Sequence, residues 1–111
     1  MTITNTPTAD LIAAAALLEA VARDSETAVD FEVPIRCGQA ATRLHSVLGT
    51  PIPAPPLVGD DLAAIRTAVA AAITKLSSAL AAPQTDAAHD SVLDALVQAR
   101  RAAAAIDPGQ R

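Results

Sequence analysis

Apolar residues recur along this chain at intervals of three and four positions, which is the spacing of one face of an α-helix. The most regular stripe consists of Leu62, Ile65, Val69, Ile73, Leu76 and Leu80. A second stripe near the start of the chain consists of Leu11, Ala15, Leu18, Ala22, Ser25 and Val29. Two further stripes consist of Cys37, Ala40, Ala41, Leu44, Val47 and Leu48, and of Val92, Leu96, Ala99, Ala103 and Ile106. Opposite the last stripe, Asp90, Asp94 and Arg101 mark the solvent side. No stretch alternates between apolar and polar residues in the manner of a β-strand. The pattern predicts an all-α protein.

Proline and glycine residues divide the chain into four helical segments, because both end or begin helices. Pro7 and Pro34 suit the first turn of a helix, and Gly49 suits the position just after a helix end. The predicted helices span residues 7–30, 34–49, 60–82 and 85–106. Since the first and third connections are short, we expect a single domain, residues 1–111, folded as an antiparallel up-down four-helix bundle.

The connection between the second and third helices, residues 49–59, contains four prolines. Such a segment is stiff and extended, close to polyproline II, and can cross the end of a bundle. We expect its apolar residues Ile52, Leu57 and Val58 to pack on the core as a lid. Binding to a proline-recognising partner is an alternative, although motifs of that kind normally have disordered, polar surroundings.

Alanine occupies 28 positions, and Phe31 is the single aromatic residue. Alanine favours helices, but a buried methyl group contributes far less than the ~1.5–3 kcal/mol of a buried Leu, Ile or Val. The predicted interior is therefore thin. Between Leu62 and Ala82 the only charged residues are Arg66 and Lys75. Either the first and third helices are central in the bundle, or their outer faces are covered by another chain. A second copy, as in a homodimer, is the simplest cover, and a partner helix is the other.

Net charge and the absence of targeting signals limit which partners and which cellular compartment we expect for this protein. The net charge of −4 argues against a general nucleic-acid binder. The longest uncharged run, residues 44–59, contains four prolines, so no membrane span is predicted. No Lys or Arg precedes Arg23, and Asp10 is unfavourable in a signal peptide. A single cysteine allows no internal disulfide framework, and we expect a cytoplasmic protein.

Cys37 is the first candidate for chemistry. It follows Pro34 in the first turn of the second predicted helix, where a helix N-terminus lowers the pKa of a thiol. It also shares a helix face with Ala41 and Leu44, which predicts a buried side chain that acts as a small hydrophobe. No known signature of a nucleophilic cysteine surrounds it, so we predict the buried role.

His45 and His89 are the only histidines, and neither has a metal-ligating residue three or four positions later. A zinc site needs about three or four protein ligands, which would have to come from different helices. We therefore predict no metal and no other cofactor. His45 is expected at the boundary of the core, and His89 is expected to be partly buried at a helix start.

The segment Leu44 to Thr50 reads Leu-His-Ser-Val-Leu-Gly-Thr. It resembles the segment around the phosphorylated histidine of histidine phosphotransfer domains, which are also four-helix bundles. The resemblance implies that His45 accepts a phosphoryl group from a response-regulator partner. That family has a basic residue three positions after the histidine and a glycine four positions after it; here these positions hold Leu48 and Gly49.

The chain contains no glycine-rich phosphate loop, no paired acid and base carboxylates and no basic patch with aromatic residues. We predict no enzymatic activity and no binding to nucleic acid or membrane. The expected function is that of a helical interaction protein that self-associates or binds a partner helix. One alternative is a carrier of a small apolar ligand, in a cavity next to Ala15, Ala22, Ala40 and Ala103. Phosphotransfer through His45 is the third candidate.

Overall fold

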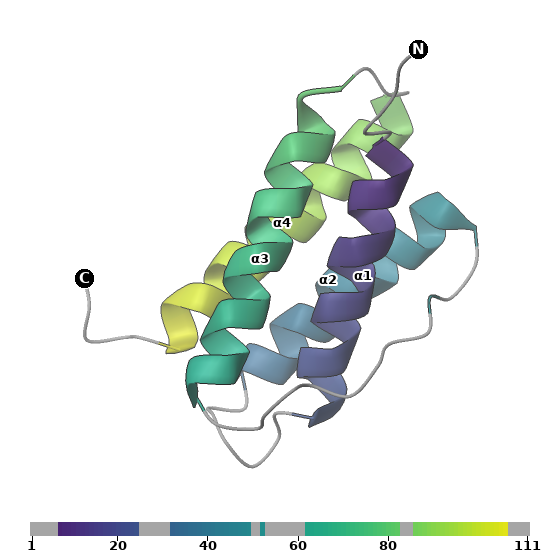
Figure 1. Cartoon of the computed structure of the whole chain (residues 1–111). Helices are drawn as coiled ribbons and strands as arrows, with labels where there is room; N and C mark the ends of the chain where they lie inside the picture. Colours follow the sequence, from purple (N-terminus) through teal and green to yellow (C-terminus); the bar gives the residue numbers. More distant parts are fainter. Residues whose placement is uncertain (1–6, 25–31, 50–51, 53–61, 83–85, 107–111) are drawn as a thin grey trace.

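The structure is a computed structural model that describes residues 7–24, 32–49, 52, 62–82 and 86–106. These residues form four helices, α1 (Pro7–Asp24), α2 (Glu32–Leu48), α3 (Leu62–Leu80) and α4 (Asp86–Ile106). They pack against one another, which confirms the predicted all-α four-helix fold (Figure 1).

The helix bounds differ from the predicted ones where the described residues stop and at the end of α3, which ends at Leu80 rather than at residue 82. Ala81 and Ala82 leave the helix, and their N–H groups donate to the carbonyl oxygens of Ser78 and Ala79 at 3.2 Å. The predicted ends of the first helix and the predicted start of the third, residues 25–30 and 60–61, lie outside the described part, as does Phe31. α2 begins at Glu32 rather than Pro34, because a proline in the first helical turn lacks only an N–H that has no partner there. α2 ends as predicted: Gly49 has a φ of 81°, and its N–H donates to the carbonyl oxygen of His45 at 2.8 Å.

Most of the proline-rich connection also lies outside the described residues, including Leu57 and Val58. Ile52 is the exception. Its side chain is half-buried and packs against the core, as expected of a residue in the proposed lid.

The order of the helices differs from the expected up-down arrangement at the connection between α2 and α3. α1 packs on α2 and α3, and α4 packs on the same two helices. Figure 1 shows α1 and α4 running towards one end of the bundle, and α2 and α3 running towards the other. The consecutive helices α2 and α3 are therefore not packed neighbours, and they run in the same direction.

The length of the connection explains why this path is possible. Residues 49–61 can reach about 40 Å when extended. The 17 residues of α2 rise by only about 25 Å. The chain can therefore begin α3 at the end of the bundle opposite to the end of α2, and it need not turn back beside α2.

The core contains most of the residues that the stripes predict, together with many alanines. Leu62, at the start of the α3 stripe, is instead 39% exposed. Half-buried stripe residues pack against the core: Ala22, Val47, Leu48, Ile73, Leu80 and Ala103. The predicted core residues that are fully buried or nearly so are Leu11, Ala15, Leu18, Cys37, Ala40, Ala41, Leu44, Ile65, Val69, Leu76, Val92, Leu96, Ala99 and Ile106. Buried alanines outside those stripes are Ala14, Ala20, Ala68, Ala72, Ala79, Ala95 and Ala102. A Cβ atom added to Gly38 in α2 would lie 3.7 Å from the Cβ atom of Ala22 in α1. Small residues thus bring these helices close together, as a thin interior requires.

α3 is long and apolar enough to cross a membrane by length and composition alone, with a mean hydropathy of 1.2 over an 18-residue window. The sequence predicts this helix but no membrane span in it, because Arg66 and Lys75 interrupt its apolar run. The core helix of a soluble protein passes the same test. In the bundle, 33% of that window is buried. The buried residues of α3 are Ile65, Ala68, Val69, Ala72, Leu76 and Ala79.

Candidate interaction surface

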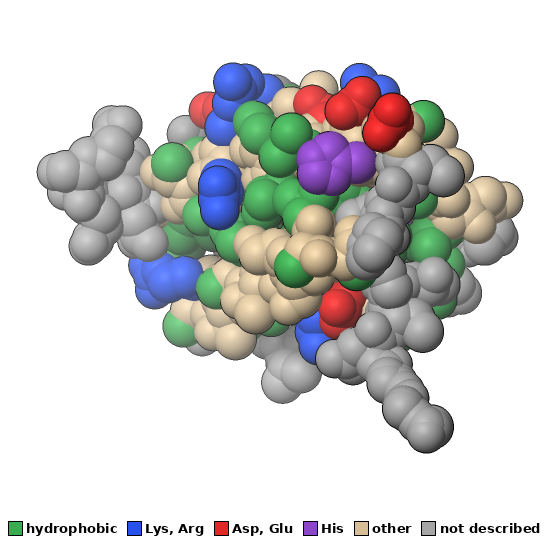
Figure 2. Space-filling view, turned by 90° about the horizontal axis from the view of Figure 1, so that it is seen from above, with side chains coloured by type: hydrophobic (Ala, Val, Ile, Leu, Met, Phe, Trp, Pro, Cys, Tyr) green, Lys and Arg blue, Asp and Glu red, His purple; other side chains and the backbone are tan. Residues whose placement is uncertain are grey.

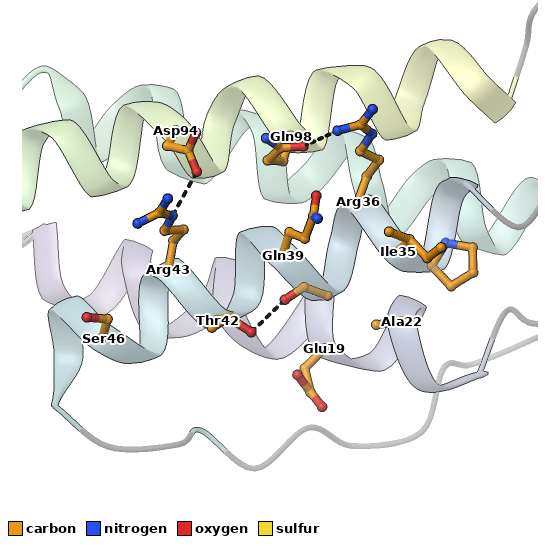
Figure 3. A pocket seen from close by; sticks show the side chains of 12 residues that line it. Glu19, Ala22, Ile35, Arg36, Gln39, Thr42, Arg43, Ser46, Asp94 and Gln98 are labelled. Carbon is orange, nitrogen blue, oxygen red and sulfur yellow. Dashed lines mark hydrogen bonds and ion pairs between the residues drawn. The ribbon is translucent and has the colours of Figure 1, made fainter.

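A depression of about 930 Å³ follows the outer face of α2 and extends to its neighbours α1 and α4 (Figure 3). Its walls are formed by Glu19, Ala22, Pro34, Ile35, Arg36, Gly38, Gln39, Thr42, Arg43, Ser46, Asp94 and Gln98. These side chains are mostly polar. Of the four alanines expected around a ligand cavity, only Ala22 lines it, and Ala15 and Ala40 are fully buried in the core. The depression therefore lacks the character of a site for an apolar ligand.

The arginines in this depression are engaged with other side chains. Arg43 Nε donates to Asp94 Oδ2 at 3.0 Å, which links α2 to α4. Arg36 Nη1 donates to Gln98 Oε1 at 3.0 Å, and its Nε donates to Glu32 Oε2 at 3.1 Å. Both Arg43 and Asp94 are exposed enough that their ion pair contributes no more than about 1 kcal/mol. These contacts fix how α2 lies along α4 rather than forming a site for an anion.

Cys37 is completely buried, as its place on the α2 stripe predicts. Burial raises the pKa of its thiol from 9.0 to about 12. The thiolate is the reactive form of cysteine, and at neutral pH this side chain is a protonated thiol. Its surroundings favour the packing role over a nucleophilic one.

The two histidines lie in different environments. His45 is half-buried at the boundary of the core, as predicted, and its Nε2 atom is buried without a hydrogen-bond partner. A phosphoryl acceptor needs a ring nitrogen that a partner can reach, and the Nε2 atom, one of the two ring nitrogens, is enclosed. His89 is exposed rather than partly buried. It lies about 60° round the helix from the buried Val92, towards the outer side of α4.

Within the described segments, no group of three or more His, Cys, Asp or Glu side chains could hold a metal ion. The only such residue that is fully buried is Cys37, and the carboxylates of Glu32 and Asp94 are already paired with arginines.

Large exposed hydrophobic side chains are the remaining candidates for function. In the described ranges they are Ile12 (41%), Ile35 (44%), Leu62 (39%), Leu93 (44%) and Val97 (38%), with the exposed fraction of each residue in parentheses. α1, α2 and α3 contribute one each, and α4 contributes two. Leu93 and Val97 are four residues apart, so they are neighbours on the helix surface. The sequence pattern of this segment predicts its buried stripe but not the exposure of this pair, although the four-residue spacing was the available signal.

The outer face of α4 places this apolar pair between opposite charges. Asp86 and Asp90 lie towards the start of the helix, and Arg100 and Arg101 lie towards its end. All four side chains are exposed. Among the described residues, none of them forms a hydrogen bond or ion pair with another side chain.

The outer face of α3 is different. Its exposed residues are Leu62, Ala63, Arg66, Thr67, Ala70, Thr74, Lys75, Ser77 and Ser78. Thr74 Oγ1 donates to the carbonyl oxygen of Ala70 at 3.1 Å, so that hydroxyl is directed back onto its own helix. This face carries little charge, as expected. Most of its exposed side chains are small, so it offers little apolar surface.

An end-on view shows that charge is unevenly distributed over the surface (Figure 2). Most acidic side chains lie along one edge of this face together with some basic ones, and further basic side chains are spread over the rest of the face. Hydrophobic side chains reach the surface beside a histidine.

No family model, no curated protein and no solved structure matches this chain.

Proposed function

We propose that this chain is a non-catalytic helical interaction protein that self-associates through the outer face of α4. The supporting observation is the pair Leu93 and Val97, which expose apolar surface side by side on that face. A single exposed hydrophobic residue is ordinary, whereas neighbouring apolar residues at helical spacing are a common way for one helix to bind another. Covering such a ridge removes apolar surface from water, at roughly 25 cal/mol per Å².

The state of the polar groups supports binding over catalysis. The thiol of Cys37 is buried with a raised pKa, and the Nε2 atom of His45 is enclosed. Arg36 and Arg43 are held by side chains of the same bundle. These are the groups that a nucleophile, a general base or an anion site would use.

The proposed surface differs from the faces of α1 and α3 that the sequence favoured. Those helices expose one large apolar side chain each, Ile12 and Leu62. Small residues such as Ala70 and Thr74 surround the outer side of α3, and they would contribute little when covered.

Sedimentation equilibrium over about 1–500 µM tests the proposal, because a weak dimer reveals itself by a mass that rises with concentration. We expect a mass above that of the 11.2 kDa chain at the upper end. Leu93→Lys should return the mass to that of a monomer. Ile35→Lys is the matched control, since Ile35 and Leu93 are both 44% exposed and Ile35 lies on α2. A single-chain mass at every concentration would overturn the proposal.

A further inference from the structure

The outer face of α4 is complementary to itself in one orientation. We propose that a second copy of this chain docks on it with the two α4 helices antiparallel, related by a two-fold axis level with Ala95. This inference rests on the proposed self-association and adds its geometry. It follows from where the exposed apolar and charged residues lie along a helix whose outer side no other described helix covers.

In this arrangement the apolar pair of one copy packs on the apolar pair of the other copy. Residues that are equally far from position 95 in opposite directions face each other across an antiparallel, two-fold pair. Leu93 and Val97 each lie two positions from Ala95. Leu93 of one copy therefore packs on Val97 of the other, and the same contact is repeated on the other side of the axis.

The charges fit the same axis. Asp90 lies five positions before Ala95, and Arg100 lies five positions after it, with Arg101 beside it. Asp90 of each copy consequently faces the two arginines of the other copy. No contact inside the bundle has to break, because these three side chains form no ion pair with other described residues.

Charge also selects the orientation. In a parallel pair, Asp90 would lie against Asp90 and Arg100 against Arg100, so both charge contacts would be repulsive. In the antiparallel pair they are attractive. Exposed ion pairs of this kind contribute at most about 1 kcal/mol each, so they determine the orientation more than the strength of binding.

The size of the contact sets the expected affinity. From Asp90 to Arg101 the helix rises by about 16 Å, so the interface lies at or below the small end of specific protein interfaces. We expect a weak, concentration-dependent dimer. The other exposed hydrophobic residues, Ile12, Ile35 and Leu62, stand alone on their helices and lack such a pattern of opposite charges.

Charge reversal tests the geometry by sedimentation equilibrium at low ionic strength. The first variant is Asp90→Arg, and the second carries Arg100→Glu with Arg101→Glu. Each alone places like charges across the two-fold axis, and we expect each to weaken the dimer at least about 10-fold. An equimolar mixture should restore association, because Arg at position 90 of one chain then faces the two Glu side chains of the other, while Asp90 and the native arginines meet on the other side.

Two controls keep the result interpretable. Lys75→Glu and Gln39→Arg change charge at exposed positions of α3 and α2, away from the α4 face, and both should leave dimerisation unchanged. Circular dichroism establishes that each variant retains its helices.

The possible outcomes separate this inference from the proposed function. Weakening by each variant with recovery in the mixture supports the antiparallel pair. If the wild-type chain dimerises but the charge-reversal variants dimerise equally well, or their mixture does not recover association, this geometry is wrong and self-association still stands. A wild-type chain that stays monomeric overturns both.

Discussion

The consecutive helices α3 and α4 have similar inner sides and different outer sides. Each buries six residues against the rest of the bundle: Ile65, Ala68, Val69, Ala72, Leu76 and Ala79 in α3, and Val92, Ala95, Leu96, Ala99, Ala102 and Ile106 in α4. Outside, α3 presents mainly small neutral side chains, whereas α4 presents an apolar pair between opposite charges. Packing constrains only the inner side of each helix, so the outer side is where the two can specialise.

The two helices also show that the overall hydrophobicity of a helix differs from the amount of apolar surface that it exposes to a partner. α3 is the helix that passes a membrane-span test by composition, yet its large apolar side chains are mostly turned into the core. α4 contains five charged residues, but it exposes Leu93 and Val97 next to each other. The position of apolar residues around a helix therefore says more about its partners than their number does.

The largest expected effect comes from truncating buried leucines, which tests whether the inner sides of α3 and α4 stabilise the fold equally. Leu76→Ala in α3 and Leu96→Ala in α4 should each lower the free energy of unfolding by about 2–5 kcal/mol, because both leucines are buried. Leu93→Ala, on the outer side of α4, should change the stability of the monomer by no more than about 0.5 kcal/mol. Urea denaturation followed by circular dichroism measures all three. If either buried leucine could be truncated without loss, the two helices would not share one core.

A second test concerns the exclusion of charge from that core. Burial raises the pKa of Cys37 from 9.0 to about 12. Below pH 9 the thiol is neutral in both folded and unfolded chains, and the folded state has its full stability. As the pH rises from 9 towards 12, only the unfolded chain ionises. Stability should then fall by about 1.4 kcal/mol per pH unit, or roughly 3 kcal/mol by pH 11.

Urea denaturation between pH 8 and about 11 measures this loss. The control is Cys37→Ala, which removes the thiol and should remove its share of the alkaline loss. The remaining titrating groups, such as Lys75, are common to both proteins. An equally steep fall in the Cys37→Ala protein would contradict the assignment.

The smallest expected effect concerns the bland outer face of α3. Thr74→Ala should stabilise the protein by about 0.5 kcal/mol, because alanine has the higher helix propensity and the threonine hydroxyl only bonds back to Ala70. For a chain of this size, that corresponds to a rise of about 2–4 °C in Tm. Differential scanning calorimetry would detect it, and the dimerisation constant should not change. A loss of stability or of dimer would mean that Thr74 contacts a partner.

Periodicity predicted the four-helix fold and most of the core, since Leu, Ile and Val at helical spacing point consistently to one side. It did not identify alanines such as Ala68 and Ala95 as buried, because a methyl group is tolerated equally on an inner or an outer face. It also assumed that consecutive helices are neighbours. A connection long enough to run along the bundle removes that constraint, and α2 and α3 do not pack together.

The candidate surface was harder to predict than the fold. The buried stripe and the charged positions Asp90, Asp94 and Arg101 were identifiable in the last helix, but Leu93 and Val97 lie between them on the solvent side. Their exposure depends on which two helices flank α4, which the sequence pattern does not specify. The burial of the His45 Nε2 atom likewise depends on how the helices pack at the end of α2.

The placement of α2 and α3 on opposite sides of the bundle divides the molecule into two hairpins, α1 with α2 and α3 with α4. Each helix makes half or more of its packing with the other hairpin, since α1 lies on α3 and α2 lies on α4. A chain cut between the hairpins would yield two fragments, each with an uncovered apolar side that only the other matches. Because neither hairpin has a complete core of its own, we expect the two fragments to reassociate into the folded bundle.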